Sequence, residues 1–437
     1  MVPYWDAVGA MYGCKDGVLY IHFGDRADPN AKSIRAASKG GGVEIVGQSW
    51  IVLRHLFVQG GQSCVTIKGP KADHNVVENC WLVNASERVS VLNAAATVIR
   101  NNDITADFSS DKCVTGAWGD EEQGGNTTDE LGLKYLFYAE YKMFFGPNST
   151  SDYGNHLSGG TDNEVHGNRV SRGGQGIHVS QTTNTRIHHN TVEGMSSIGI
   201  IATMDTVVNV QIHDNLIMDC NIGCRIHHVN EIRQTAPRNV FLYRNRFWQK
   251  PGVGTGLFFH YHDRNDAEPY LHPHISIYHN SFAGGSRGAQ LSAYADRLGG
   301  VPNALVVNNA FSNPVPIYTT SRFNHLDRAW TFDYNWLGGT GKSAAVWCGP
   351  HNVDAKGQTI WDTSKAPDTA LPANSKARNT GLDLSTPFEL EGRKFPPMPG
   401  MEAGYFAGAG PDIGSPELMP QGGAQPMKDP NKCRNQQ

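Results

Sequence analysis

The sequence has little net charge and no long apolar run. It contains 37 Lys and Arg against 41 Asp and Glu, for a formal charge of −4, and only 18% of its 437 residues are charged. Proteins that bind nucleic acid or anionic membranes usually carry a basic excess, so the charge gives no reason to expect either partner. A membrane-spanning helix needs about 18 or more consecutive apolar residues. No such run occurs, and we expect no membrane span.

The sequence also lacks a visible signal peptide and a zinc-finger spacing of cysteines. Its first residues, MVPYWDAVGAMYGCKDG, contain no basic segment followed by an apolar one. None of the eight cysteines has the spacing of a zinc finger. Cys220 and Cys224, in DCNIGC, could form a short disulfide or pack in a core. We favour the core because buried free cysteine packs as a small apolar residue.

What the sequence does contain is glycine, with 49 residues, and a repeated phrase of the form apolar-x-x-Asn-x-apolar. His55 takes the equivalent position one step before the first of nine asparagines, with successive gaps of 24, 23, 66, 22, 25, 30, 35, 29 and 26 residues. Short alternating strands at a period of about 20–35 residues predict an all-β solenoid. The asparagines that define this register are Asn79, Asn102, Asn168, Asn190, Asn215, Asn245, Asn280, Asn309 and Asn335.

A second phrase, Gly-apolar-x-apolar, accompanies the first, as in GIHVSQ, GIIATM, GCRIHH, GLFFHY and GAQLSA. Two or three short strands separated by turns make one coil, or rung, of a single-stranded parallel β-helix. Equivalent residues then stack at about 4.8 Å, the spacing between neighbouring strands. An inward Asn at a turn can bond to the Asn of the next rung, which satisfies amides whose unpaired burial costs about 1–3 kcal/mol each. We therefore predict an asparagine ladder.

These two phrases resemble those of the right-handed parallel β-helix repeat proteins, the architecture of pectate lyases, chondroitinase B-like lyases and many glycoside hydrolases. The resemblance covers about residues 40–340 and implies a right-handed solenoid of about ten rungs. We assign the solenoid to residues 1–340, with a long insertion at about 105–153, and an irregular C-terminal segment to 341–437. The stretch GVLYIHFGDRADPN resembles one that usually follows earlier rungs, so another chain could cover an open N-terminal end.

Strand alternation predicts which residues face outward. The residue after each Gly faces inward, so the second, fourth and sixth positions face solvent. The second positions hold His156, His178, Ile201, Arg225, Phe258 and Gln290; the fourth hold Ser158, Ser180, Thr203, His227, His260 and Ser292; the sixth hold Gly160, Thr182, Asp205, Val229, His262 and Tyr294. His, Arg, Phe and Tyr concentrated over five rungs predict a groove for a polysaccharide. We take its substrate-binding residues to be His156, His178, Ser180, Thr203, Phe258, His262 and Gln290.

A lyase acting by β-elimination fits these residues best. It needs a group that neutralises the substrate carboxylate, a base that removes the adjacent proton and an acid that protonates the leaving oxygen. The fork of Arg225 matches a uronate carboxylate. His227 or His260 can be the base because imidazole titrates near neutrality, and Tyr294 or the other histidine the acid. We expect an extracellular or cell-surface enzyme acting on an anionic polysaccharide.

Three other interpretations remain open. A glycoside hydrolase needs two carboxyl groups, of which Asp205 can be one. A structural or adhesive surface solenoid would only bind glycan. His227, His260, His262 and Asp205 are also possible zinc or copper ligands, and GDEEQ at 119–123 is a possible calcium site, although we commit to no metal.

Overall fold

The computed structural model describes strands and turns only, and no helix occurs in the described residues. These are 11–15, 18–22, 42–59, 63–83, 87–105, 135–137, 153–203, 207–229, 239–262, 274–293, 304–319, 330–339, 349–358, 360–364, 367, 371–403, 405–406 and 409–414. No part of this described chain offers a helix suited to crossing a membrane.

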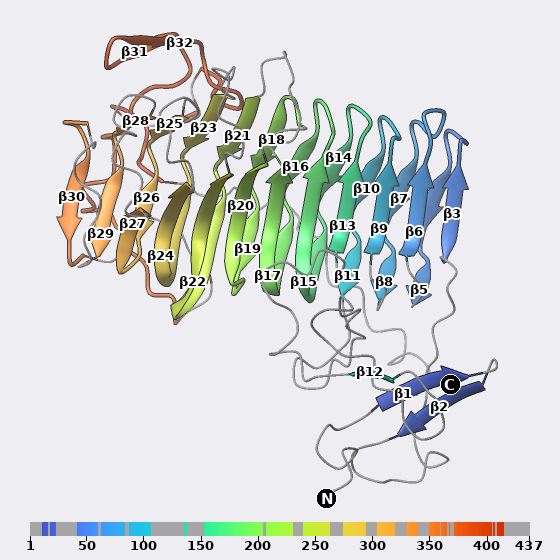
Figure 1. The fold of residues 1–437 in the computed structure, drawn as a ribbon. Helices are drawn as coiled ribbons and strands as arrows, with labels where there is room; N and C mark the ends of the chain where they lie inside the picture. Colours follow the sequence, from blue (N-terminus) through green and yellow to red (C-terminus); the bar gives the residue numbers. More distant parts are fainter. Residues whose placement is uncertain are drawn as a thin grey trace, which may run out of the picture. The chain divides into compact units, whose positions relative to one another are not determined.

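One side of the solenoid is a ten-stranded parallel sheet. It receives one short strand from each coil, and neighbouring coils pair in register (Figure 1). Its strands are β4 (Val52–Arg54), β7 (Val76–Glu78), β10 (Val98–Arg100), β14 (Glu164–His166), β16 (Arg186–His188), β18 (Val210–His213), β21 (Asn239–Tyr243), β23 (His274–Tyr278), β25 (Ala304–Val307) and β28 (Trp330–Asp333).

A seventeen-stranded parallel sheet contains the other strands of the coils. In β15 and β22 the pairing register shifts partway along the strand, and a long strand such as β17 pairs with two shorter ones, β19 and β20. The strands are β3 (Val43–Val46), β5 (Phe57–Gln59), β6 (Ser63–Lys68), β8 (Trp81–Val83), β9 (Glu87–Leu92), β11 (Asp103–Thr105), β13 (Tyr153–Ser158), β15 (Arg169–Ser180), β17 (Thr191–Thr203), β19 (Leu216–Met218), β20 (Ile222–Val229), β22 (Arg246–His262), β24 (Ser281–Ala293), β26 (Ala310–Ser312), β27 (Val315–Thr319), β29 (Trp336–Gly339) and β30 (Val353–Lys356).

The interior of the coils is a continuous apolar core, as the alternation predicts. Ile177 and Val179 of β15 are fully buried, whereas the intervening His178 is half-buried on the other face. The same alternation recurs in β17, where Ile200 and Ala202 point inward. Cys220 and Cys224 are free thiols in this core, and burial raises the pKa of both to about 12. The preference for core packing over a disulfide is therefore confirmed.

The predicted asparagine ladder is confirmed, with a correction at its start. Each member donates from Nδ2 to Oδ1 of the next at 2.9–3.2 Å, from Asn102 through to Asn352, which the sequence phrase did not include. Asn79 is not a member. It has a φ of 52°, like the turn residue that precedes each ladder Asn, and Cys80 occupies the ladder position, its N–H donating to Asn102 Oδ1 at 2.9 Å. His55, with a φ of 57°, corresponds to Asn79 rather than to the ladder.

A column of glycines explains the second phrase. A Cβ on Gly176 would lie 2.3 Å from the carbonyl oxygen of Gly199, and one on Gly199 would lie 2.5 Å from that of Gly223. Real Cβ atoms do not approach backbone that closely, so each coil needs a residue without a side chain at this point. The glycine leading each phrase is therefore a packing requirement between adjacent coils.

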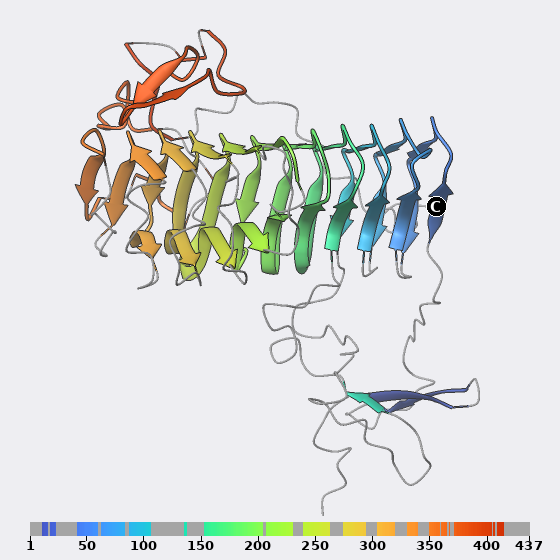
Figure 2. The ribbon, with the colours of Figure 1, turned by 45° about the horizontal axis from the view of Figure 1, so that its top comes forward.

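The C-terminal segment packs on the outside of the later coils. Leu384, Leu390, Met398 and Met401 form a second apolar cluster with outward residues of β21, β23 and β25. The segment includes a two-stranded antiparallel hairpin, β31 (Phe388–Leu390) and β32 (Arg393–Phe395). Figure 2 shows this segment, in orange and red, beside the end of the solenoid. It is thus an outer layer of the solenoid unit.

The chain divides into two compact units: residues 40–106 with 152–437, and residues 1–39 with 107–151. In the second unit, β1 (Met11–Lys15) pairs antiparallel with β2 (Val18–His22) and with β12 (Tyr135–Phe137). Residues 11–22 therefore form no rung, unlike the assignment of 1–340 to the solenoid. The described rung strands instead run from β3 to β30, so coiling continues beyond residue 340.

Candidate functional site

A row of outward side chains crosses adjacent strands of the seventeen-stranded sheet. Direct register pairing joins each member to the next on β13, β15, β17, β20, β22, β24 and β27. We call this row the flank: His156, His178, Ile201, Arg225, Phe258, Gln290 and Tyr318. Arg225 and Ile201 are more covered than the prediction of an open solvent face implies, with exposed fractions of 9% and 6%.

One end of the flank holds a connected polar group. His156 Nδ1 lies 3.2 Å from Glu87 Oε1, and the His156 ring stacks on His178 with centroids 5.1 Å apart. His178 Nε2 lies 3.1 Å from Thr203 Oγ1. A carboxylate, two imidazoles and a hydroxyl thus span neighbouring coils.

The electrostatics of this group favour a neutral His178 and an ionised Glu87. Burial lowers the pKa of His178 to about 3, with further lowering from His156 and Arg225 and a raising contribution from Glu87. The hydrogen bond from His156 lowers the pKa of the Glu87 carboxyl, against the opposing effect of burial. At neutral pH His178 therefore serves as a hydrogen-bonding group rather than a proton donor.

The other end of the flank combines guanidinium groups with aromatic rings. The Arg225 guanidinium lies 5.7 Å from the Phe258 ring centroid, and Arg287 lies 4.1 Å from that of Tyr318. Arg287 also donates to Gln290 Oε1 at 2.5 Å. Arg side chains held over aromatic rings present their N–H groups in a fixed orientation.

Some of the remaining predicted site residues lie on described strands, and others lie outside the described residues. Thr203, His227, His260 and Ser292 are successive register partners, two residues along from the flank positions, and His262 pairs with Val229. Ser180 is half-buried at the end of β15. Asp205 and Tyr294 lie outside the described residues, as do 119–123. The sixth-position rule is wrong at Thr182, which is buried in a turn and bonds Gly160 O at 3.3 Å.

Sequence reasoning missed Glu87, Arg287 and Tyr318. Glu87 begins a strand that no glycine leads, so a search for Gly-led phrases passed over it. Arg287 precedes its glycine, and Tyr318 belongs to VPIYT, which has none. The register pairs Glu87 with Tyr153 and Ser90 with His156, so Glu87 reaches His156 only through its side chain.

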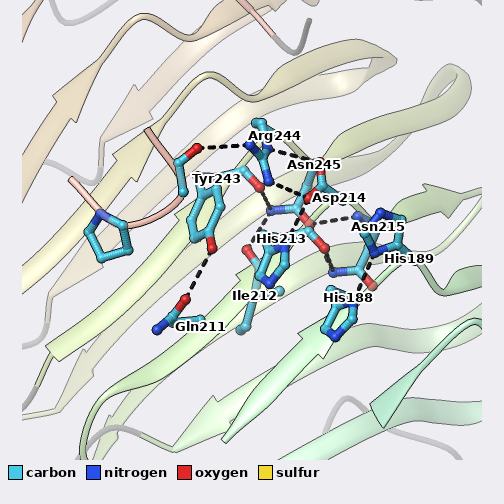
Figure 3. Close-up of polar contacts among 12 residues, drawn as sticks. His188, His189, Gln211, Ile212, His213, Asp214, Asn215, Tyr243, Arg244 and Asn245 are labelled. Carbon is cyan, nitrogen blue, oxygen red and sulfur yellow. Dashed lines mark hydrogen bonds and ion pairs between the residues drawn. The ribbon is translucent and has the colours of Figure 1, made fainter. Parts of the chain in front are cut away.

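The ten-stranded sheet carries a separate column of stacked rings on its outer face. His166, His188, His213, Tyr243 and Tyr278 stack with centroid distances of 4.7–5.0 Å between neighbours. Figure 3 shows His213 bonded to Asp214, which in turn accepts two hydrogen bonds from Arg244. Their place in the strand before each ladder Asn predicts that His188, His213 and Tyr278 are exposed. This is wrong, because Tyr278 is fully buried and the two histidines are mostly covered.

The described residues contain no group of three or more His, Cys, Asp or Glu side chains arranged to hold a metal ion. The zinc or copper interpretation depended on Asp205 and on the side chains of His227, His260 and His262, which lie outside the side chains that the structure describes.

Comparison with known proteins agrees with this geometry. The model of the right-handed β-helix region matches residues 145–266. The unit of residues 40–106 and 152–437 is a right-handed parallel β-helix. This right-handed β-helix is also similar to the solved structure titled Dettilon tailspike protein (gp208), with 14% identity and a TM-score of 0.34 over 70% of this chain and 61% of that one. No curated protein matches the sequence significantly.

Proposed function

We propose that this β-helix binds and cleaves an anionic, uronic-acid polysaccharide by β-elimination along the flank. The observation that carries the proposal is the register row itself, which aligns two histidines, Arg225, Phe258 and Gln290 along successive coils, with Ile201 between His178 and Arg225. Five steps of about 4.8 Å give roughly 24 Å, the length of four to five sugar rings. Such a row can follow an extended chain, with a flat ring for stacking and polar groups for hydroxyls.

Arg225 is assigned to the substrate carboxylate. Its guanidinium, oriented by Phe258, offers paired N–H donors that match a carboxylate fork. Neutralising that charge makes the adjacent C–H more acidic, which is the first requirement of elimination. His227 and His260 occupy paired register positions next to Arg225 and Phe258, and we assign one of them as the base. Tyr294 or the other histidine is assigned as the acid that protonates the leaving oxygen, and Asp205 is assigned to the catalytic group as its carboxylate.

The neutral His178 and its partner Thr203 are assigned to sugar hydroxyls. Ser180, His262 and Gln290 complete the proposed binding row, and His156 is positioned by Glu87. A polymeric substrate of this kind places the protein outside the cell or on its surface, which is part of the proposal.

Glu87 also supports a second candidate, a glycoside hydrolase that uses Asp205 with another carboxylate. The flank does contain an ionised carboxylate, which can act as a base or nucleophile. A hydrolase needs a protonated acid as well, and the lowered pKa of the Glu87 carboxyl makes it unsuitable for that role. The lyase therefore remains the better supported function. A solenoid that only binds glycan is the non-enzymatic alternative.

The test is a screen of polyuronates and neutral glycans with two readouts, ultraviolet absorbance of an unsaturated product and release of reducing ends. A lyase gives both signals on polyuronates, a hydrolase gives only reducing ends, and a binding protein gives neither. Single variants Arg225→Gln, His227→Gln and His260→Gln should each lower turnover by about a hundredfold or more. Arg186→Gln, on the ten-stranded sheet, is the matched control. Full activity in Arg225→Gln, His227→Gln and His260→Gln alike would refute the assignment.

A further inference from the structure

A cleft of about 530 Å³ lies between the C-terminal hairpin and the ten-stranded sheet. Its floor is a row of outward side chains on three adjacent coils, Phe241, Ser276 and Leu305, which pair directly in register. Ile275 and Ala304 also line it. This floor belongs to a different sheet from the flank.

The hairpin that roofs the cleft is held in place by its turn and by its neighbours. Glu391 and Gly392 have φ values of 50° and 74°, the conformation of a tight two-residue hairpin turn. Phe388 and Phe395, paired across the hairpin, stack with centroids 5.1 Å apart. Because side chains two residues apart on a strand point to the same face, Arg393 lies on the same face of the hairpin as Phe395.

The irregular segment that follows the hairpin anchors it to the solenoid. Tyr278 Oη donates to Pro399 O at 2.7 Å, and Arg244 Nη1 donates to Gly400 O at 2.9 Å. Met398 packs in the apolar cluster beside these contacts and forms part of the cleft lining. These contacts cover the adjacent row of outward rings. In the floor of the cleft Phe241 stays half-buried, whereas Ser276 and Leu305 are buried, so the cleft is built into the packing of the segment.

The lining has one sign of charge. Among the described residues of the lining, Arg393 and Lys394 are charged, and this described set includes no Asp or Glu. Phe241 and Phe395 offer flat apolar surfaces, while Asn239 and Ser276 offer groups that bond hydroxyls. Aromatic faces pack against the C–H face of a sugar ring, and a guanidinium matches a carboxylate. The volume falls within the range of small-ligand sites, about 300–1,000 Å³.

We propose that this cleft is a second, non-catalytic site that binds one uronate residue of a polysaccharide through Arg393, Phe241 and Phe395. The identity of the ligand rests on the proposed function, but the site itself does not use any residue of the flank. A second site on another face would hold a long polymer while the flank acts on a different segment of it.

The experiment measures binding of methyl glucuronide to the whole protein by calorimetry, in an Arg225→Gln background that weakens the flank. Arg393→Gln should reduce the remaining affinity by about tenfold or more, because a charge-assisted contact is lost. Phe241→Leu, which keeps an apolar floor, should also weaken binding. Arg378→Gln, which removes an exposed guanidinium from the same C-terminal segment, should leave it unchanged.

Equal binding of methyl glucoside, or unchanged affinity in both Arg393→Gln and Phe241→Leu, would overturn the proposal. Preferential binding of octanoate over methyl glucuronide would overturn it as well, because the cleft would then select an alkyl chain. Failure of the lyase function has a different signature: no polyuronate is cleaved, while glucuronide binding still depends on Arg393.

Discussion

The asparagine ladder gives the most direct quantitative test of the fold, through replacement of Asn215 by alanine. Asn215 is fully buried in the middle of the ladder. It accepts hydrogen bonds at 3.0 Å from both the backbone N–H and Nδ2 of Asn190. It donates to Asn245 Oδ1 at 2.9 Å, to Ile187 O at 2.9 Å and to His213 O at 3.0 Å.

The expected loss of stability follows from the hydrogen-bonding groups that lose the Asn215 side chain as their partner. Nδ2 of Asn190 keeps its bonds to Val165 O and His188 O. The backbone N–H of Asn190 and the Ile187 carbonyl instead lose the amide of Asn215, in a place that water does not reach. Each buried polar group left unsatisfied costs about 1–3 kcal/mol, so Asn215→Ala should lower the free energy of unfolding by about 2–6 kcal/mol.

Urea unfolding followed by tryptophan fluorescence measures this change. The control is Asn209→Gly, which removes an exposed asparagine with a φ of 53° and its 2.9 Å bond to Asn184 Oδ1. Glycine tolerates that φ, so the control should change stability by no more than about 0.5 kcal/mol. Equal losses in Asn215→Ala and Asn209→Gly would show that burial of the ladder contributes nothing, and the reasoning would fail.

Three further predictions concern pH, packing and thiol reactivity. The pKa of His178 falls from an ordinary 6.5 to about 3 in the fold, so protons bind the unfolded chain more tightly. The stability that this provides is complete above about pH 6.5 and is lost as the pH falls toward 3, with a slope of up to about 1.4 kcal/mol per pH unit. His178→Gln should flatten that slope in urea titrations; an unchanged slope would contradict the shift. Gly199→Ala should destabilise the protein by about 1–3 kcal/mol, since its Cβ would lie 2.5 Å from Gly223 O, and an unaltered urea midpoint would refute the packing argument. Cys224, whose thiol pKa burial raises to about 12, should react with Ellman's reagent only on unfolding; labelling of the native protein at that residue would show the core to be accessible.

The fold could be predicted because its inward residues are constrained at every coil. Asn168 and its equivalents must satisfy the same buried amides, and Gly176 and its equivalents must avoid the same carbonyl. Such requirements recur with the coil and therefore show in the sequence. The error at Asn79 arose because the turn position before the ladder also tolerates asparagine, so two adjacent positions offered the same residue type.

The outward residues carry no comparable constraint, and this limits prediction of the site. The register brought His156, His178, Arg225 and Phe258 into one row because inward pairing fixes their neighbours. Glu87 was missed because its position depends on a side chain reaching across to the next coil, which no repeat encodes. The coverage of Tyr278 depends on a segment more than a hundred residues later in the chain, and local alternation carries no information about it.

The same separation between inward and outward positions explains how one solenoid can hold two binding faces. The ladder gaps vary from 17 to 66 residues, yet every ladder bond stays within 2.9–3.2 Å. Connections of different length therefore leave the register unchanged, and an outward residue on any coil keeps its neighbours whatever lies between them in sequence. The flank and the cleft under the hairpin use different sheets of that fixed frame, so substitutions in one should leave the geometry of the other intact. A ladder substitution such as Asn215→Ala, by contrast, should perturb both.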